Sequence, residues 1–203
     1  MDALAIIADE LQQRDRDRWL ACLYAAAPAR PALVALLALD CELAHVVASS
    51  TESLLGEIKL AWWRDRLTDM DSKPAPAQPL LQALQARLLP WISGAELAQL
   101  EDRWLCRLDG DAQSPAHVAG GGHLFALAAV LLGGDPVEAD ALGRAWTQGL
   151  AVPGRTTSPL RPLRALAELA RRDAARRSAG QPPEPRGSLK RQAQMFKVVA
   201  LGR

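Results

Sequence analysis

Phenylalanine and tyrosine are scarce in this sequence of 203 residues, which contains two of the former and one of the latter. Aromatic and β-branched residues favour strands, so their scarcity argues against a sheet protein. Alanine and leucine instead supply much of the hydrophobic 49%, and both lose little entropy in a helix. Nearly every segment also repeats its apolar residues at helical spacing. The sequence therefore predicts an all-α fold.

A surplus of charge of one sign is also absent, because 24 Lys and Arg nearly balance 23 Asp and Glu. A protein that binds nucleic-acid phosphates would be expected to carry a clear basic excess. The balanced charge therefore predicts no nucleic-acid partner.

Cysteine is sparse. The sequence contains three cysteines, which is an odd number, and they are widely spaced, at Cys22, Cys41 and Cys106. A disulfide framework favours an even count, and a zinc site favours close pairs of ligands. Each cysteine lies in an apolar helical pattern, where a free thiol behaves as a small buried hydrophobe. We therefore expect buried thiols in a reducing compartment.

Uninterrupted apolar runs are short. Phe125–Leu132, for example, falls far below the roughly 20 residues that a membrane-spanning helix requires. The first residues include Asp2, Asp9 and Glu10 and show no basic region followed by an apolar core, so no signal peptide is expected. These features predict a cytoplasmic protein, or one peripheral to a membrane surface.

The apolar periodicity predicts the positions of the helices, and Pro28 and Pro31 interrupt the first long pattern. Proline-rich stretches at 72–79 and 178–187 are predicted loops. We expect one domain over 1–203, with the helices 30–48, 52–70 and 114–132 at the centre of the bundle. The predicted helices cover residues 2–13, 15–26, 30–48, 52–70, 79–90, 94–108, 114–132, 136–151, 160–178 and 188–201.

Two charged clusters, at 14–18 and 171–177, are predicted to form solvated helix faces, with an anion site as the alternative. Gly120–Gly122, between His117 and His123, is predicted to let two helices approach closely or to kink one. The six tryptophans are predicted to lie in the core or at its edge. The alternative is a tryptophan stripe that lines an apolar cavity.

Several segments occur in an order that is specific when they are taken together. RWLACLY at Arg18–Tyr24 precedes a proline break and a long apolar helix, and LLGEIKLAWWRD follows at Leu54–Asp65. Val118-Ala119-Gly120 with Gly122, Ala141–Trp146 and the C-terminal Arg186-Gly187-Ser188 come next. In this order they resemble the squalene/phytoene synthase family. The segment Leu54–Asp65 is similar in sequence to the "LGEIRLQWWRD" helix of that family.

The resemblance implies a helical bundle of the isoprenoid synthase type around a central cavity. In that family, two aspartate-rich motifs on facing helices hold Mg²⁺, which binds the diphosphates of two prenyl substrates. Carboxylates four residues apart share a helical face, their oxygens suit Mg²⁺, and the metal stabilises the leaving diphosphate.

This sequence departs from the family at both acidic motifs. Ala44, His45 and Ala48 occupy the places of the first motif, and 141–167 contains no Asp or Glu. The chain also appears shortened after about residue 150. We therefore expect no magnesium-dependent condensation of prenyl diphosphates, no catalytic or metal residue, and no cofactor.

The segment Cys41–Val46 resembles the "VELAQV" of a subgroup that includes a mitochondrial complex I assembly factor. That likeness implies a binding or assembly protein, whose partner would be an isoprenoid or other apolar ligand, another protein or a membrane surface. The alternative is a prenyl transferase of squalene/phytoene, carotenoid or hopanoid biosynthesis, in which case Mg²⁺ would be required.

Candidate binding residues lie mainly on the segments that carry the resemblance. Glu42 and His45 share a helical face, as an acid–imidazole pair that binds a ligand or as a core hydrogen bond. Asp65 and Asp69 are either a displaced metal or diphosphate site or a polar helix end. The full set of predicted substrate-binding residues is Arg18, Tyr24, Glu42, His45, Trp63, Arg64, Asp65 and Asp69.

Overall fold

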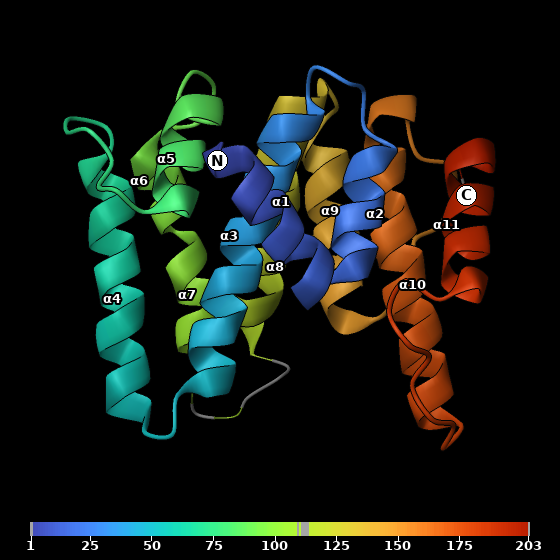
Figure 1. The fold of residues 1–203 in the computed structure, drawn as a ribbon. Helices are drawn as coiled ribbons and strands as arrows, with labels where there is room; N and C mark the ends of the chain where they lie inside the picture. The colour runs from blue at the N-terminus through green and yellow to red at the C-terminus, as the bar shows by residue number, and fades with distance from the viewer. Residues whose placement is uncertain (1, 109, 111–113, 203) are drawn as a thin grey trace.

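A computed structural model describes residues 2–108, 110 and 114–202, and every regular element within them is a helix (Figure 1). The predicted all-α fold is confirmed. The elements are α1 (Ala3–Arg14), α2 (Arg16–Leu23), α3 (Arg30–Ser49), α4 (Ser53–Asp69), α5 (Pro79–Arg87), α6 (Gly94–Ala98), α7 (Leu100–Leu105), α8 (Pro115–Leu132), α9 (Pro136–Gln148), the 3₁₀ turn η1 (Ser158–Leu160), α10 (Arg161–Ser178) and α11 (Leu189–Leu201).

Side-chain caps set several helix boundaries. Asp2, Asp15 and Asp135 each accept a hydrogen bond from an amide in the first turn of α1, α2 and α9. The predicted helix 94–108 is two helices, because the backbone turns at Gln99 between α6 and α7. Asp71 accepts hydrogen bonds from the amides of Gly94 and Ala95, so it fixes the start of α6.

Helix α3 forms the centre of the core, as predicted, and most of its residues from Ala32 to Leu43 are buried. By length and composition, α3 and α8 are the two described helices that could cross a membrane. In this fold 67% of the apolar window of α3 is buried by other helices. The hydrophobicity of α3 is therefore accounted for by its place in the core.

Helix α4 was predicted at the centre of the bundle, and this prediction is wrong. α4 lies at one edge of the molecule (Figure 1), and it buries only Gly56, Leu60, Trp63 and Leu67. Apolar side chains on its other faces remain open to solvent, namely Leu54, Leu55, Ile58 and Trp62. The sequence misleads here because α4 is apolar on more sides than the core covers.

Glycines bring α8 and α9 into backbone contact, which confirms the predicted close approach of two helices. A Cβ on Gly143 would lie 2.1 Å from the carbonyl oxygen of Gly121, and one on Gly121 would lie 1.9 Å from Thr147 Oγ1. A methyl group does not fit at either place. Gly120 likewise packs against the side chain of Arg103, at 2.4 Å from the position of a Cβ.

The charged residues 14–18 do not form a solvated face, contrary to the prediction, because Asp15, Asp17 and Arg18 are buried. Asp17 accepts hydrogen bonds of 2.9 Å from the Gly187 amide and from Arg191 Nε. These bonds join α2 to the start of α11. A charge run that looks solvent-exposed in the sequence is therefore buried by a helix far along the chain.

Candidate functional site

A groove between α3 and α4 brings together some of the residues predicted to bind substrate. It has a volume of about 490 Å³, within the range of small-molecule sites. Glu42, His45 and Trp63 all line it, so the structure places these predicted residues at one site. The remaining lining residues are Val46, Ser49, Ile58, Lys59 and Trp62.

The groove has an apolar wall on α4 and a mixed wall on α3. Trp62 and Trp63 meet edge to face, with ring centroids 5.2 Å apart and planes at 83°. Trp63 is buried, whereas Trp62 and Ile58 keep about half of their surface open. The apolar wall is therefore continuous from the core to the solvent-facing side of α4.

The predicted pair of Glu42 and His45 does not form. Glu42 instead pairs with Arg14 at the end of α1, and the His45 side chain is exposed at the groove. One turn of α3 separates the two residues, but the Glu42 carboxylate is engaged by Arg14 of α1. Besides the Ser49 hydroxyl, His45 and Lys59 are thus the polar groups that the groove offers to a ligand.

The predicted residues Arg64, Asp65 and Asp69 lie on the polar half of α4 and do not line the groove. Arg64 pairs with Asp65 at 3.2 Å and with Glu101 at 3.4 Å. Asp69 pairs with Arg66 and accepts a hydrogen bond from Lys73 Nζ at 2.9 Å. The bond from Lys73 lowers the pKa of Asp69. These contacts are those of a polar helix end that faces solvent.

The predicted residue Arg18 lies inside the bundle, in a charged cluster that the sequence analysis missed. Its Nη1 is 2.8 Å from Oδ2 of Asp40, which is fully buried on α3. Trp104 Nε1 donates to Asp40 Oδ1 at 2.8 Å, and Arg103 Nε lies 3.7 Å from that same oxygen. Two buried guanidinium groups therefore share one carboxylate.

The pKa values of this cluster follow from burial and mutual attraction. Burial alone would raise the pKa of Asp40, but Arg103, Arg18 and the Trp104 bond hold it below its usual value. Burial lowers the pKa of Arg103 to about 10, although Asp40 acts in the opposite direction. All three groups remain charged near neutral pH, and the buried Asp15, 3.3 Å from Arg18 Nε, supplies a second negative charge beside them.

Aromatic rings fill the space beside this charged cluster. The guanidinium carbons of Arg18 and Arg103 lie 5.1 and 4.7 Å from the Trp146 ring centroid. Phe125 stacks on Trp146, with ring centroids 4.9 Å apart and planes at 18°. The alternative expectation that Trp146 lines a cavity together with Trp62 and Trp63 is wrong. Trp146 is partly buried and packs against the core beside the charged cluster, whereas Trp62 and Trp63 line the open groove.

The last predicted residue, Tyr24, caps the C-terminus of α2 and packs at the edge of the core. Of the other signals, the predicted burial of thiols is confirmed for Cys22 and Cys41, whereas Cys106 is half-buried. His117 and His123 form hydrogen bonds that link helices, because their ring nitrogens lie 2.9 and 3.0 Å from the carbonyl oxygens of Arg103 and Glu96.

The residues present do not fit the magnesium ions of the squalene/phytoene synthases. At the places of the first acidic motif, Ala44, His45 and Ala48 offer one imidazole, although Mg²⁺ prefers oxygen ligands. Among residues 2–108, 110 and 114–202, no group of three or more His, Cys, Asp or Glu side chains could hold a metal ion. We therefore derive no step that uses a bound metal.

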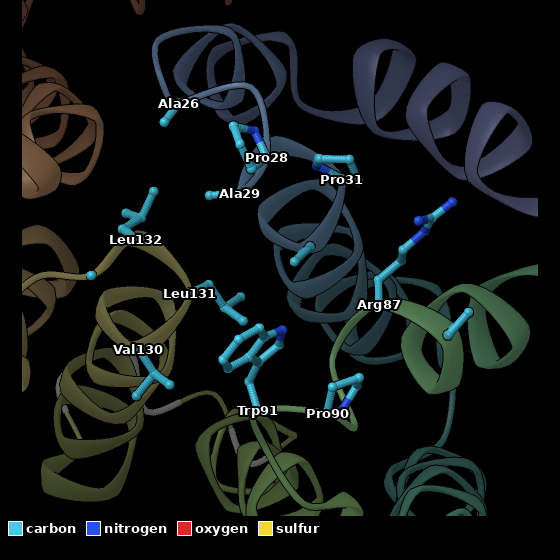
Figure 2. Close-up of a pocket in the computed structure, with 13 residues that line it drawn as sticks. Ala26, Pro28, Ala29, Pro31, Arg87, Pro90, Trp91, Val130, Leu131 and Leu132 are labelled. Carbon is cyan, nitrogen blue, oxygen red and sulfur yellow. The ribbon is translucent and has the colours of Figure 1, made fainter.

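A second groove of about 470 Å³ lies at the N-terminal end of α3 and contains none of the predicted residues (Figure 2). Trp91 projects into it between Leu131 and Pro90, and Pro28 and Pro31 form the wall across from them. Trp91 is 70% exposed, so it is not the core residue that the sequence suggested.

Comparison with known proteins finds a match in the N-terminal part of the chain. The family model described as squalene/phytoene synthase matches residues 11–89, from the end of α1 through α5. Both walls of the groove between α3 and α4 fall inside this segment. No curated protein and no solved structure matches the chain significantly. The segment from residue 11 to residue 89 is therefore similar to the squalene/phytoene synthase family, and it lies in an all-α fold.

Proposed function

We propose that this protein binds an apolar, isoprenoid-like ligand in the groove between α3 and α4 and does not condense prenyl diphosphates. The observation that carries the proposal is the makeup of the groove. Trp62, Trp63, Ile58 and Val46 supply an apolar surface where the family resemblance places an acidic motif. Burial of apolar surface is favourable without a metal ion.

The small number of carboxylates in the groove supports the non-catalytic part of the proposal, because Glu42 is the single acid among its lining residues. Glu42, the acid in its lining, is engaged by Arg14. Asp65 and Asp69 lie on another part of α4, each in an ion pair. Ionisation of a prenyl diphosphate requires the departing negative charge to be stabilised, and these residues offer no set of metal ligands for that purpose.

The polar groups of the groove suit one end of an amphipathic ligand. His45 and Lys59 can donate hydrogen bonds to a hydroxyl or phosphate, while the chain lies against Trp62 and Ile58. A prenyl alcohol or monophosphate has this form. We therefore expect an extended ligand with one polar end.

Tryptophan fluorescence tests the proposal directly, because Trp62 and Trp63 line the groove. We expect a saturable change when farnesol or farnesyl thiodiphosphate is added, and no effect of EDTA on it. Trp91→Phe, which alters the other groove, should leave the change intact. Trp62→Phe should diminish it. A chain that shows no response at any ligand concentration would refute the binding proposal.

The alternative, a prenyl transferase, makes a different prediction. If the protein is an enzyme, incubation with farnesyl or geranylgeranyl diphosphate and Mg²⁺ yields squalene or phytoene. We expect no product above that of a heat-denatured control. Ligand binding that EDTA abolishes would also support the enzyme, and Asp65 and Asp69 would then be the first residues to substitute.

A second candidate function, assembly of a respiratory complex, draws on the exposed apolar side chains of α4. Leu54 and Leu55 extend the apolar surface of Ile58 and Trp62 along the helix beyond the groove. This surface could pack against an amphipathic helix of an assembling subunit. Deletion in the native cell should then lower complex I activity and leave carotenoids and hopanoids unchanged. The opposite pattern would favour the transferase.

A further inference from the structure

An apolar stripe runs along the side of α11 that faces away from the bundle. Leu189, Ala193, Phe196 and Ala200 follow one another at spacings of four, three and four residues, so they share one helical face. Leu189 is 83% exposed and Phe196 is 65% exposed. The helix lies at the edge of the molecule, and its outer side is uncovered (Figure 1).

The opposite face of α11 holds the helix to the protein. Arg191, Met195 and Val198 are buried there. Arg191 bonds to Asp17 and to Asp173, and Arg161 Nη1 donates to the Val199 carbonyl at 3.1 Å. Because these contacts fix the helix, the exposed stripe is a permanent feature of the surface. It does not require the helix to detach.

The charge beside the stripe is entirely basic. Residues 185–203 contain five basic residues and no Asp or Glu. Lys190 and Lys197 are seven residues apart, both are exposed, and helical geometry places them together on one flank of the stripe. Their long apolar stems can lie along a nonpolar surface while the ammonium groups stay in a polar one.

Carboxylates on neighbouring elements neutralise Arg186 and Arg191 but leave the charge of the two lysines. Asp15 and Asp17 on the α2 side pair with Arg186, and Asp17 also pairs with Arg191. Asp173 on α10 pairs with Arg191, and Glu184 in the preceding loop pairs with Arg172. Each acid is thus already matched by an arginine, so Lys190 and Lys197 remain available on the outer face.

We propose that α11 docks the protein onto the surface of a membrane that contains anionic lipid. Leu189 and Phe196 enter the boundary between headgroups and acyl chains, and Lys190 and Lys197 contact the acidic headgroups. A basic flank without any acid complements an anionic lipid surface. It would not select a protein partner with mixed charge. This docking is independent of the ligand groove, which α3 and α4 form.

Vesicle sedimentation tests the proposal with the full chain. The bound fraction should be large with phosphatidylcholine vesicles that contain phosphatidylglycerol, small with phosphatidylcholine alone, and should fall as salt is added. Lys190→Gln and Lys197→Gln should each weaken binding about fivefold. Phe196→Ser should also release the protein, whereas Val137→Ser, at an exposed apolar residue of α9, should not.

Three outcomes would overturn the proposal. The first is equal sedimentation with and without phosphatidylglycerol. The second is unchanged binding by Phe196→Ser while circular dichroism shows the helical content of the unsubstituted protein. The third is a concentration-dependent dimer that Phe196→Ser dissociates, because the stripe would then be an interface between two copies of this chain.

Discussion

Arg18 and Asp40 form an ion pair of 2.8 Å between α2 and α3, and the Asp40 side chain has no exposed surface. Asp40 also faces Arg103, so one carboxylate attracts two guanidinium groups in the interior. Removal of the carboxylate would leave Arg103 buried without the acid that it faces and would leave Arg18 with Asp15 alone, which is far more costly than the loss of an exposed pair.

Asp40→Asn should therefore lower the free energy of unfolding by about 3–5 kcal/mol. Chemical denaturation followed by circular dichroism measures this. Asp65→Asn is the matched control, because it removes a carboxylate whose pair with Arg64 is about half exposed, and it should cost less than about 1 kcal/mol. Equal effects of the two substitutions would contradict the account of the interior.

The lowered pKa of Asp40 also predicts how stability depends on acid. A carboxyl whose folded pKa lies below its unfolded value of about 4 contributes fully above that value. The contribution is lost as the pH falls through the folded pKa. Between about pH 5 and pH 2, the unsubstituted protein should lose more free energy of unfolding than Asp40→Asn. If the free energy of unfolding of both proteins fell in parallel with pH, Asp40 would not titrate in this way.

Gly143→Ala should destabilise the protein, because the new methyl group would lie 2.1 Å from the Gly121 carbonyl oxygen. Backbone atoms cannot move aside like a flexible side chain, so α8 and α9 must separate. We expect a loss of about 1–3 kcal/mol, measured by denaturant unfolding. Ala141→Ser, at an exposed position of the same helix, should stay within about 0.5 kcal/mol of the unsubstituted protein.

Ile58→Ser should weaken ligand binding in the groove between α3 and α4 by about tenfold. The half-exposed isoleucine lies against the ligand space, and its replacement removes roughly 1.5 kcal/mol of apolar burial. Farnesol titration followed by fluorescence gives the dissociation constant. Val137→Ser on α9 removes a comparable exposed side chain outside the groove and should leave the constant unchanged. Equal weakening by both would point to a nonspecific apolar effect.

The helices could be predicted from the sequence because their determinants are local. Apolar spacing and the prolines near residue 30 placed α3 within a residue of its observed end. The glycines at 120–122 predicted a close approach of two helices, which the structure shows between α8 and α9. The position of α4 could not be predicted in this way. Its apolar residues indicate a helix that packs, but only the tertiary arrangement decides which side is covered.

The buried charges were missed for a related reason. Residues 14–18 look like a solvated run, because their partners Gly187 and Arg191 are distant in the sequence. Asp40 did give a signal, as the one charged residue between Ala32 and Cys41 in a helix of the core. A lone acid in such a segment requires a buried basic partner, although the sequence does not reveal that Arg18 and Arg103 fill this role.

The bonds from Asp17 to Gly187 and to Arg191 span 170 and 174 residues. During synthesis, α2 leaves the ribosome long before either partner exists, so a nascent chain carries Asp17 in water until residue 191 has been added. Docking of α2 against α11 therefore belongs to the last stage of folding. A chain whose translation stops before α11 cannot form the contact between α2 and α11, and Asp17 is then left without Arg191.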